Sequence, residues 1–389
     1  MNVIQVSHLY RPSIGGIENY SHRLVNSLRE SGHTASVITT DSSLTNDQTP
    51  LSMETQVSYC STTATLFRNP LSIELFRRVR ASSASLYHLH SPWYLSSLEA
   101  ILAIPDDAAV VLTIHGFQPL KSMTAKLLST AYKPFAQYIF DRVDHTIVLG
   151  RSERDRLLKE YDVNPRDVSV IPNGIHPESF ETSRSDIKQV QAKYGIDPTT
   201  PTVLFLSRLV PLKNPDVLVD AVAKHLPEQE LDVLMIGNGD DDYVAELQRR
   251  ADDRFVFHSN LPFDDIKSLY HAASLFVLPS HMEGLPTVLL EAMNARTPVI
   301  TTAAGAIGDV ITHREHGHIL ERPPRPESLA AAIQYYLDRP EERREIGRRN
   351  RAYVRGSFDW ADVAEEIESV YDRALETQGR VGRQLTPSN

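Results

Sequence analysis

The chain of 389 residues contains one cysteine, Cys60, and no long apolar run. A single thiol cannot form a disulfide within the chain, which excludes a disulfide-stapled fold and is typical of a reducing compartment. No apolar run of about 18 residues occurs, so no membrane-spanning helix is expected. The N-terminus lacks a basic segment followed by an apolar stretch, so no signal peptide is expected either. These absences predict a cytoplasmic protein.

Basic residues are also in the minority. The 40 Lys and Arg stand against 50 Asp and Glu, which gives a net charge of −10. This balance argues against general nucleic-acid binding. The acidic excess is uneven, because residues 1–180 contain 16 basic and 17 acidic side chains and the rest of the chain contains 24 and 33. The N-terminal half is therefore the better suited to meet an anionic surface.

Short apolar runs alternate with helix-length segments along most of the chain. This alternation predicts parallel sheets with crossover helices, in the α/β class. The runs fall into two series, and the length exceeds that of a typical single core, so two doubly wound domains are expected. The predicted strands are 3–6, 35–39, 86–89, 110–114, 145–149 and 168–171 in the first series, and 202–206, 231–236, 254–257, 274–278 and 298–301 in the second.

The domain limits follow from the polar stretch 178–188, which comes shortly after Pro172-Asn173-Gly174. We expect an N-terminal domain over 1–178 and a C-terminal domain over 179–357. A last helix is expected over 358–377, with an apolar stripe that packs on a domain surface, and the polar end 378–389 is expected to be disordered. The stripe consists of Trp360, Val363, Ile367, Val370 and Tyr371.

The most informative segment is 280–293, which places Glu283 and Glu291 eight positions apart around a predicted helix start. Pro286 suits the first helical turn, and Gly284 lets backbone amides approach a ligand closely. The N–H groups of a helix N-terminus favour an anion such as a diphosphate. Because carboxylates accept hydrogen bonds from sugar hydroxyls, the pattern suits a nucleotide-sugar. Taken alone, it is equally compatible with a helix that carries solvated acids.

A second basic loop follows the first strand of the second series. Arg208 lies at the carboxyl end of that strand, where open α/β sheets bind ligands. Lys213 comes five positions later, near a helix start. An Arg fork and a Lys point charge together can neutralise a diphosphate and stabilise the charge of a departing nucleotide. Two solvated bases in a loop would give the same pattern.

Two weaker signals lie in the first half. Gly15 and Gly16 stand between a strand and a helix, where backbone amides can meet a phosphate or sugar, but the full dinucleotide fingerprint is missing. His115 ends the strand 110–114 and could bind a sugar hydroxyl or act in proton transfer, although an isolated histidine more often has a structural role. No metal motif occurs, so no metal ligand is expected.

The segment 66–80 mixes apolar residues with four arginines. Such a stretch can rest on an anionic membrane surface. A packed helix with solvated bases is the alternative interpretation. The segment nevertheless favours an acceptor at the cytosolic face of a membrane.

Together these motifs resemble the retaining, nucleotide-sugar-dependent glycosyltransferases that have two Rossmann-like domains facing across a cleft, the GT-B type. The family-four class is the most similar. The resemblance covers nearly the whole chain, and its motifs occur in the family's order. They are Gly15-Gly16, Pro172-Asn173-Gly174, Arg208 with Lys213, Gly237-Asn238-Gly239, the pair Glu283 and Glu291, and Trp360.

The resemblance also implies residue roles. Arg208 and Lys213 would bind the donor diphosphate, Glu291 the ribose, and Glu283 the donor sugar. His115 would lie near the reacting sugar, and together with Arg208, Lys213 and Glu283 it forms the expected catalytic set. Gly16 would lie near the donor, and no acceptor residue is assigned. The backbone expected beside Glu283 is that of Gly284, Leu285, Pro286 and Thr287.

The function implied is transfer of a hexose-type sugar, with retention, from a nucleotide diphosphate sugar to a hydroxyl acceptor in glycolipid, lipid-linked oligosaccharide or polysaccharide synthesis. A UDP-sugar is the first expectation for the donor and a GDP-sugar the second. No cofactor or metal is expected, the acceptor would bind mostly on the N-terminal domain, and the last helix would return to that domain. A nucleotide-sugar epimerase, a GT-B phosphorylase and a non-catalytic nucleotide-sugar binding protein are the alternatives.

Overall fold

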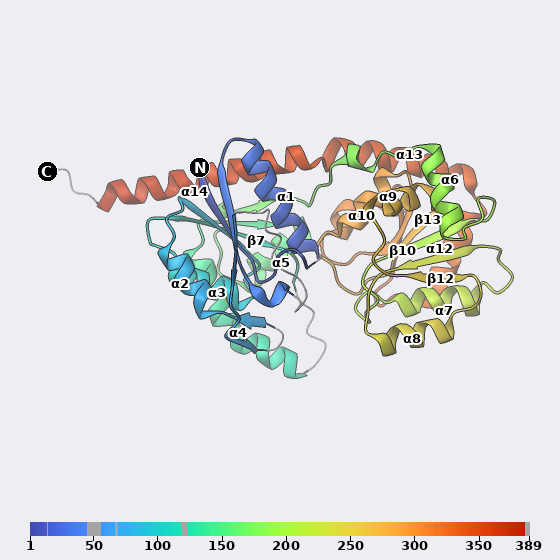
Figure 1. Ribbon diagram of the computed structural model, residues 1–389, viewed down its shortest axis with the longest axis horizontal. Helices are drawn as coiled ribbons and strands as arrows, with labels where there is room; N and C mark the ends of the chain where they lie inside the picture. Colours follow the sequence, from blue (N-terminus) through green and yellow to red (C-terminus); the bar gives the residue numbers. More distant parts are fainter. Residues whose placement is uncertain (14, 45–55, 67–68, 118–122, 386–389) are drawn as a thin grey trace. The chain divides into compact units, whose positions relative to one another are not determined.

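The computed structural model describes residues 1–13, 15–44, 56–66, 69–117 and 123–385. The chain forms two compact units, shown in Figure 1. Unit 1 comprises Met1–Pro172 together with Ala361–Asn389, and unit 2 comprises Asn173–Trp360. Both are parallel α/β units, as the alternation of apolar runs predicts.

Unit 1 contains a seven-stranded sheet in the order β3-β2-β1-β6-β7-β8-β9, and every neighbouring pair is parallel. The strand order reverses between β1 and β6, which is where doubly wound sheets bind ligands at the carboxyl ends of the strands. The sheet strands are β1 (Asn2–Val6), β2 (Thr34–Thr40), β3 (Val57–Cys60), β6 (Leu86–His90), β7 (Ala109–Ile114), β8 (His145–Val148) and β9 (Val168–Val170), and β4 (Ala64–Leu66) with β5 (Asn69–Leu71) forms a separate antiparallel pair.

Crossover helices join these strands. Local sequence sets the start of α2, because the Ser72 side chain accepts a hydrogen bond from the Leu75 amide and caps the helix. The helices of unit 1 are α1 (Gly16–Glu30), α2 (Ile73–Ala81), α3 (Leu95–Ala103), α4 (Met123–Arg142), α5 (Arg151–Glu160) and α14 (Trp360–Leu385), with short 3₁₀ turns at η1 (Asp41–Ser43) and η2 (Pro165–Asp167).

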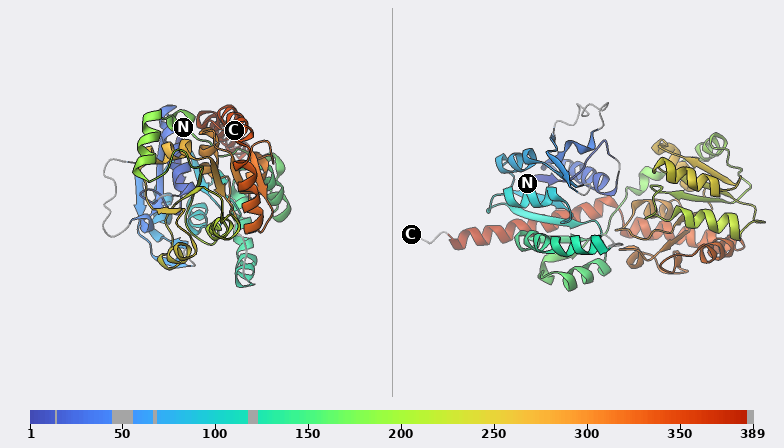
Figure 2. Two further views of the ribbon diagram at one scale, coloured as in Figure 1. Left: turned by 90° about the vertical axis from the view of Figure 1, so that its right-hand side faces the viewer. Right: turned by 90° about the horizontal axis from the view of Figure 1, so that it is seen from below.

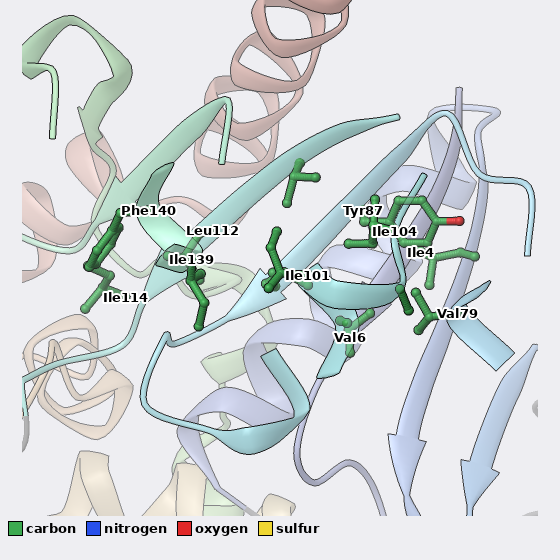
Figure 3. Packing of buried hydrophobic residues seen from close by; sticks show 14 of the residues in the cluster. Ile4, Val6, Val79, Tyr87, Ile101, Ile104, Leu112, Ile114, Ile139 and Phe140 are labelled. Atoms are coloured by element: carbon green, nitrogen blue, oxygen red, sulfur yellow. The ribbon is translucent and has the colours of Figure 1, made fainter. Parts of the chain in front are cut away.

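Side chains alternate across the unit 1 sheet, and its two faces differ in chemistry. One face carries apolar residues such as Ile4 and Leu112, which belong to the same core cluster as Ile101 of α3 and Ile139 of α4 (Figure 3). Because successive side chains on a strand point to opposite faces, the residues between them point to the other face. That second face contains a band of buried polar side chains, namely Gln5, His88, His90 and Thr113.

Helix α14 lies along unit 1 (Figure 1, red). The predicted stripe from Trp360 to Tyr371 is almost fully buried, which confirms that it packs on a domain surface. Hydrogen bonds fix the helix along its length: Ser31 donates to Glu368, and Gln378 donates to Asp144. The helix extends to Leu385, so the prediction of a disordered segment from 378 was wrong up to that residue, and 386–389 lie outside the described residues.

Unit 2 contains a six-stranded parallel sheet in the order β12-β11-β10-β13-β14-β15, with the strand order reversing between β10 and β13. Figure 2 shows helices on both faces of this sheet. The strands are β10 (Thr202–Leu206), β11 (Asp232–Ile236), β12 (Phe255–His258), β13 (Leu275–Leu278), β14 (Val299–Thr302) and β15 (Gly317–Leu320). The helices are η3 (Pro177–Phe180), α6 (Arg184–Lys193), α7 (Pro215–His225), α8 (Asp241–Arg250), α9 (Phe263–Ala272), α10 (Thr287–Asn294), α11 (Ile307–Val310), α12 (Pro326–Leu337) and α13 (Pro340–Ser357).

The division between the units differs from the predicted limit at residue 178. It falls after Pro172, because the segment that follows is tied to unit 2. The Asn173 side chain donates to the Leu285 carbonyl, and the Ile175 amide donates to the Phe358 carbonyl. Among the described helices, none is both long and apolar enough to cross a membrane.

Candidate active site

The two charged residues singled out in unit 2 form an ion pair. Lys213 Nζ lies 2.6 Å from Glu283 Oε1, and the two side chains are only 12% and 8% exposed. Lys213 comes from the loop after β10, and Glu283 from the loop between β13 and α10. The strand order reverses between β10 and β13, so the pair lies at the switch point of the unit 2 sheet.

Backbone contacts hold the two loops together. The His281 amide donates to the Leu212 carbonyl at 2.9 Å. Below Glu283 lies Gly305, whose φ is +57° and whose missing Cβ would stand 2.0 Å from the Glu283 carbonyl oxygen. Since only glycine fits there, Gly305 allows the backbone at Glu283 to approach this closely. The neighbouring Ala306 amide donates a hydrogen bond to the Gly284 carbonyl.

Arg208 is exposed at the carboxyl end of β10. Its loop is supported by the Gly237-Asn238-Gly239 segment, because the Leu209 amide donates to the Asn238 carbonyl at 2.8 Å. A Cβ on Gly237 would stand 1.8 Å from the Ser207 carbonyl oxygen, and one on Gly239 would stand 2.2 Å from the Leu209 carbonyl oxygen. These two glycines are therefore explained by close backbone approach to the Arg208 loop.

Helix α10 begins at Thr287, and Pro286 is its N-cap residue rather than its first helical residue. The prediction that Pro286 lies in the first turn was thus one position early, although its missing N–H is still without cost there. The first amides of α10 have no acceptor within the helix, as at any helix start. Leu285, by contrast, is buried, and its carbonyl accepts the Asn173 amide hydrogen bond at 2.6 Å.

Glu291 lies one turn inside α10, as predicted, and is 8% exposed. Its Oε2 accepts a hydrogen bond from the buried Tyr270 hydroxyl at 2.9 Å. Burial, together with the neighbouring Glu291 charge, raises the pKa of Tyr270 well above its usual value. The hydroxyl therefore remains a donor and fixes one oxygen of the Glu291 carboxylate, a contact that sequence spacing does not reveal.

The two glycines before α1 have different surroundings. A Cβ on Gly15 would stand 2.2 Å from Glu18 Oε2, because this carboxylate folds back over the helix start. A Cβ on Gly16 would meet nothing within 4 Å. Since the obstacle at Gly15 is the end of a side chain that can turn away, the fold requires a glycine at neither position.

His115 follows β7 and belongs to a hydrogen-bonded network. Its Nε2 lies 3.0 Å from His90 Nδ1, and its ring packs edge-on against Tyr20 at 4.8 Å between ring centroids. His90 continues to Gln5, at 2.8 Å between Nε2 and Oε1. Burial lowers the pKa of His115 to about 3 and that of His90 well below the usual range, so both rings are neutral at pH 7.

In comparisons with known proteins, each of the two units matches a family model. Residues 14–179 match the family model described as Glycosyltransferase Family 4, and residues 186–353 match that described as Glycosyl transferases group 1. A D-inositol 3-phosphate glycosyltransferase from Corynebacterium diphtheriae is 30% identical, over 74% of this chain and 70% of its own. The chain therefore belongs to the glycosyltransferases that these two family models describe. It is also 28% identical to an alpha-maltose-1-phosphate synthase from Mycolicibacterium smegmatis, over 77% and 82% of the two chains.

Solved structures share the fold of this glycosyltransferase. Anabaena HepE in complex with UDP aligns with a TM-score of 0.77 at 19% identity and covers 96% of this chain and 100% of its own. Sucrose-phosphate synthase from Thermosynechococcus elongatus aligns with a TM-score of 0.78 at 21% identity, over 97% and 99%. The predicted fold class of two Rossmann-like domains is confirmed.

Within the glycosyltransferase, each unit carries part of the predicted site residues. In unit 2 these are Lys213 and Glu283 in contact, with Arg208 and Glu291 on neighbouring elements at the same sheet edge. In unit 1 they are Gly16 and His115, after β1 and β7. A search of the described residues found no group of three or more His, Cys, Asp or Glu side chains placed to hold a metal ion.

One cavity of about 250 Å³ lies away from all of these residues. It is lined by Ile104, Asp106, Arg142 and Asp144, which precede β7 and β8 or flank them at their amino ends. Parallel α/β sheets bind their ligands at the carboxyl ends. This cavity therefore lies at the amino ends of the unit 1 strands, opposite the end at which the candidate site residues lie.

Proposed function

We propose that this glycosyltransferase moves a hexose-type sugar from a nucleotide diphosphate sugar to a hydroxyl acceptor, with retention of configuration. The observation that supports the donor site most directly is the shielded pair of Lys213 and Glu283 at the start of α10. A cation, a carboxylate and the N–H groups of a helix start meet there, and these are the partners that a diphosphate and a sugar require.

The proposed roles follow from position. Arg208 and Lys213 bind the donor diphosphate, and the helix start contributes the N–H groups between Gly284 and Thr287. Glu283 holds the donor sugar. Glu291 accepts hydrogen bonds from the ribose through the carboxylate that Tyr270 holds in place.

A UDP-sugar is our first choice of donor, because Anabaena HepE has been solved with UDP and with UDP-glucose. A GDP-sugar is the second choice. The acceptor is proposed to be a lipid-linked sugar, a glycolipid or a growing polysaccharide.

In the proposed mechanism, the nucleotide diphosphate leaves while the acceptor hydroxyl attacks from the same face. A leaving phosphate oxygen takes the acceptor's proton, so no separate general base is needed. Arg208, Lys213 and the α10 start stabilise the charge that develops on the leaving phosphate. Since these groups supply positive charge at the diphosphate, transfer is proposed to need no metal or other cofactor.

The first test is thermal stabilisation by a panel of nucleotides and nucleotide-sugars. A ligand at 100 times its dissociation constant adds about 2.7 kcal/mol of stability, which shifts the melting temperature by several degrees. We expect one nucleotide series to raise the melting temperature by this amount. The shift should be the same with and without a metal chelator. Glu291→Gln should weaken the shift, whereas the exposed Glu228→Gln, also in unit 2, should leave it unchanged.

Turnover separates the alternatives from transfer. An epimerase would convert the donor without an acceptor, a phosphorylase would need inorganic phosphate, and a binding protein would be stabilised without any turnover. A panel in which no nucleotide shifts the melting temperature would count against the donor site itself.

Peripheral membrane contact is proposed for α2. Leu75 and Val79 are buried against unit 1, while Ile73 and Phe76 are 47% and 38% exposed on the opposite side of the helix. Arg77 and Arg80 are exposed on that same side, so an apolar and basic face remains outside the core. Residues 67 and 68 of the predicted segment lie outside the described residues.

Vesicle co-sedimentation tests this contact. The protein is expected to bind vesicles that contain anionic lipid, and the double variant Arg77→Gln/Arg80→Gln should bind with about 30-fold lower affinity, since each basic residue near such a surface contributes about 1 kcal/mol. The exposed pair Arg344→Gln/Arg348→Gln on α13 is the matched control. Equal sedimentation of all three proteins would remove α2 from the contact.

A further inference from the structure

A chain of hydrogen-bonded polar side chains inside unit 1 links the C-terminal helix to His115. Its members come from β1, β6, β7 and α14, and all of them except His115 have no exposed surface. Parallel sheets covered on both faces are normally apolar throughout. The chain runs from Thr113 through His88, Tyr371, Gln5 and His90 to His115.

The Gln5 amide gives this chain a direction. Its Oε1 faces His90 Nε2 at 2.8 Å, and its Nε2 donates to the Tyr371 hydroxyl at 3.1 Å. An amide oxygen can only accept, so His90 must carry its proton on Nε2. A neutral imidazole has one N–H, and His90 Nδ1 is therefore an acceptor for His115 Nε2–H.

The other arm of the chain is consistent with the same direction. Because the Tyr371 oxygen receives the Gln5 amide proton, its own hydroxyl proton is available for His88 Nδ1 at 2.6 Å. His88 then donates from Nε2 to the Thr113 hydroxyl at 2.7 Å. Each member except Thr113 donates once along the chain, Thr113 only accepts, and each of the five contacts has one proton.

We propose that Gln5 and Tyr371 are positioning residues: through His90 they hold His115 in the Nε2–H tautomer and leave its Nδ1 as a hydrogen-bond acceptor for a sugar hydroxyl. Among the described residues, no hydrogen-bond partner of this Nδ1 is found. The consequence for transfer rests on the proposed function, whereas the tautomer itself does not.

The tautomer matters because the rings stay neutral. Burial lowers the pKa of His88 and of His115 to about 3, so protonation does not place protons on both nitrogens at working pH. The only choice left to each ring is which nitrogen carries its proton. Tyr371 lies on α14, so this helix acts on His115, which follows β7, through Gln5 and His90.

Nitrogen NMR of the full-length protein with ¹⁵N-labelled histidine tests the tautomer directly. Long-range proton–nitrogen correlations distinguish the two tautomers, and the His115 signals are assigned by their loss in His115→Gln. We expect the Nε2–H form in the unsubstituted protein. An Nδ1–H form would mean that the Gln5 amide points the other way and would overturn the proposal.

Tyr371→Phe removes the hydroxyl and keeps the buried ring. The Gln5 amide then loses its acceptor, so both tautomers of His115 should be populated and kcat should fall by about tenfold, while the donor KM changes little. Gln5→Met, which removes the acceptor of His90, should have the same effect. Glu368→Gln is the control, because Glu368 lies on the same helix and binds Ser31 rather than the polar chain.

The outcomes separate the two proposals. An unchanged His115 tautomer in both Tyr371→Phe and Gln5→Met would show that these residues do not position the ring. Equal losses of kcat in Glu368→Gln would assign the effect to docking of the helix. If the unsubstituted protein has the Nε2–H tautomer but transfers no sugar, the proposed function fails and the positioning stands.

Discussion

Lys213→Met is expected to reduce sugar transfer by about 10³-fold, because it removes the cation that stands closest to Glu283. Methionine retains much of the length and packing of the lysine side chain but has no charge. Lys213 has three N–H donors, so in the ion pair it can bond Glu283 and still reach a phosphate oxygen. The measurement is release of nucleotide diphosphate in the presence of acceptor.

The same substitution is expected to destabilise the protein. Both side chains are nearly buried, and removing one partner of a buried pair leaves an uncompensated charge, which costs about 3–5 kcal/mol. A loss of transfer in Lys213→Met alone could therefore reflect partial unfolding. The expected fall in melting temperature is measured by calorimetry beside the transfer assay.

The double variant Lys213→Met/Glu283→Gln separates the two effects. Without either charge the desolvation cost disappears, so the melting temperature should return close to its original value. Transfer should stay as low as in the single variant. Methionine cannot replace the lysine cation beside the diphosphate, and glutamine cannot replace the carboxylate that holds the sugar. Recovery of transfer in the double variant would remove both residues from the mechanism.

The sequence predicted strands well where the apolar runs were long and central. All eleven predicted strands exist, because buried parallel strands need nearly continuous apolar residues. The predictions missed β3 and β15, each at one edge of its sheet and only partly buried, although they included the opposite edge strands β9 and β12. They also missed the β4 and β5 pair, whose short strands carry few apolar residues.

The sequence placed the predicted site residues on their helices, strands and loops, but it did not predict which of them are in contact. Spacing put Lys213 near one helix start and Glu283 before another, yet their contact spans 70 positions and depends on which strands are neighbours. Tyr270 and Asn173 were missed as partners of Glu291 and Leu285 for the same reason. Gln5 could have been noticed, since a polar residue in an otherwise apolar buried strand needs a partner.

Gly305→Ala is expected to destabilise unit 2 by about 2–5 kcal/mol, the sum of a strained positive φ and a steric clash. At φ +57° the new Cβ would stand 2.0 Å from the Glu283 carbonyl oxygen and 2.8 Å from that of Gly284. Neither obstacle is the end of a flexible side chain, so the backbone of the Glu283 loop must move. Calorimetry should show a lower melting temperature.

The displaced loop should also weaken donor binding, which makes Gly305→Ala a test of position as well as of stability. With Glu283 and the α10 start shifted away from Lys213, nucleotides should raise the melting temperature of the variant by less than they raise that of the original protein. Gly356→Ala is the matched control, because a Cβ there meets nothing within 4 Å and alanine favours the α13 helix. A Gly305→Ala protein that melts and binds nucleotide like the original would show that this loop does not depend on the glycine, and that the Glu283 carbonyl can move without loss of the donor site.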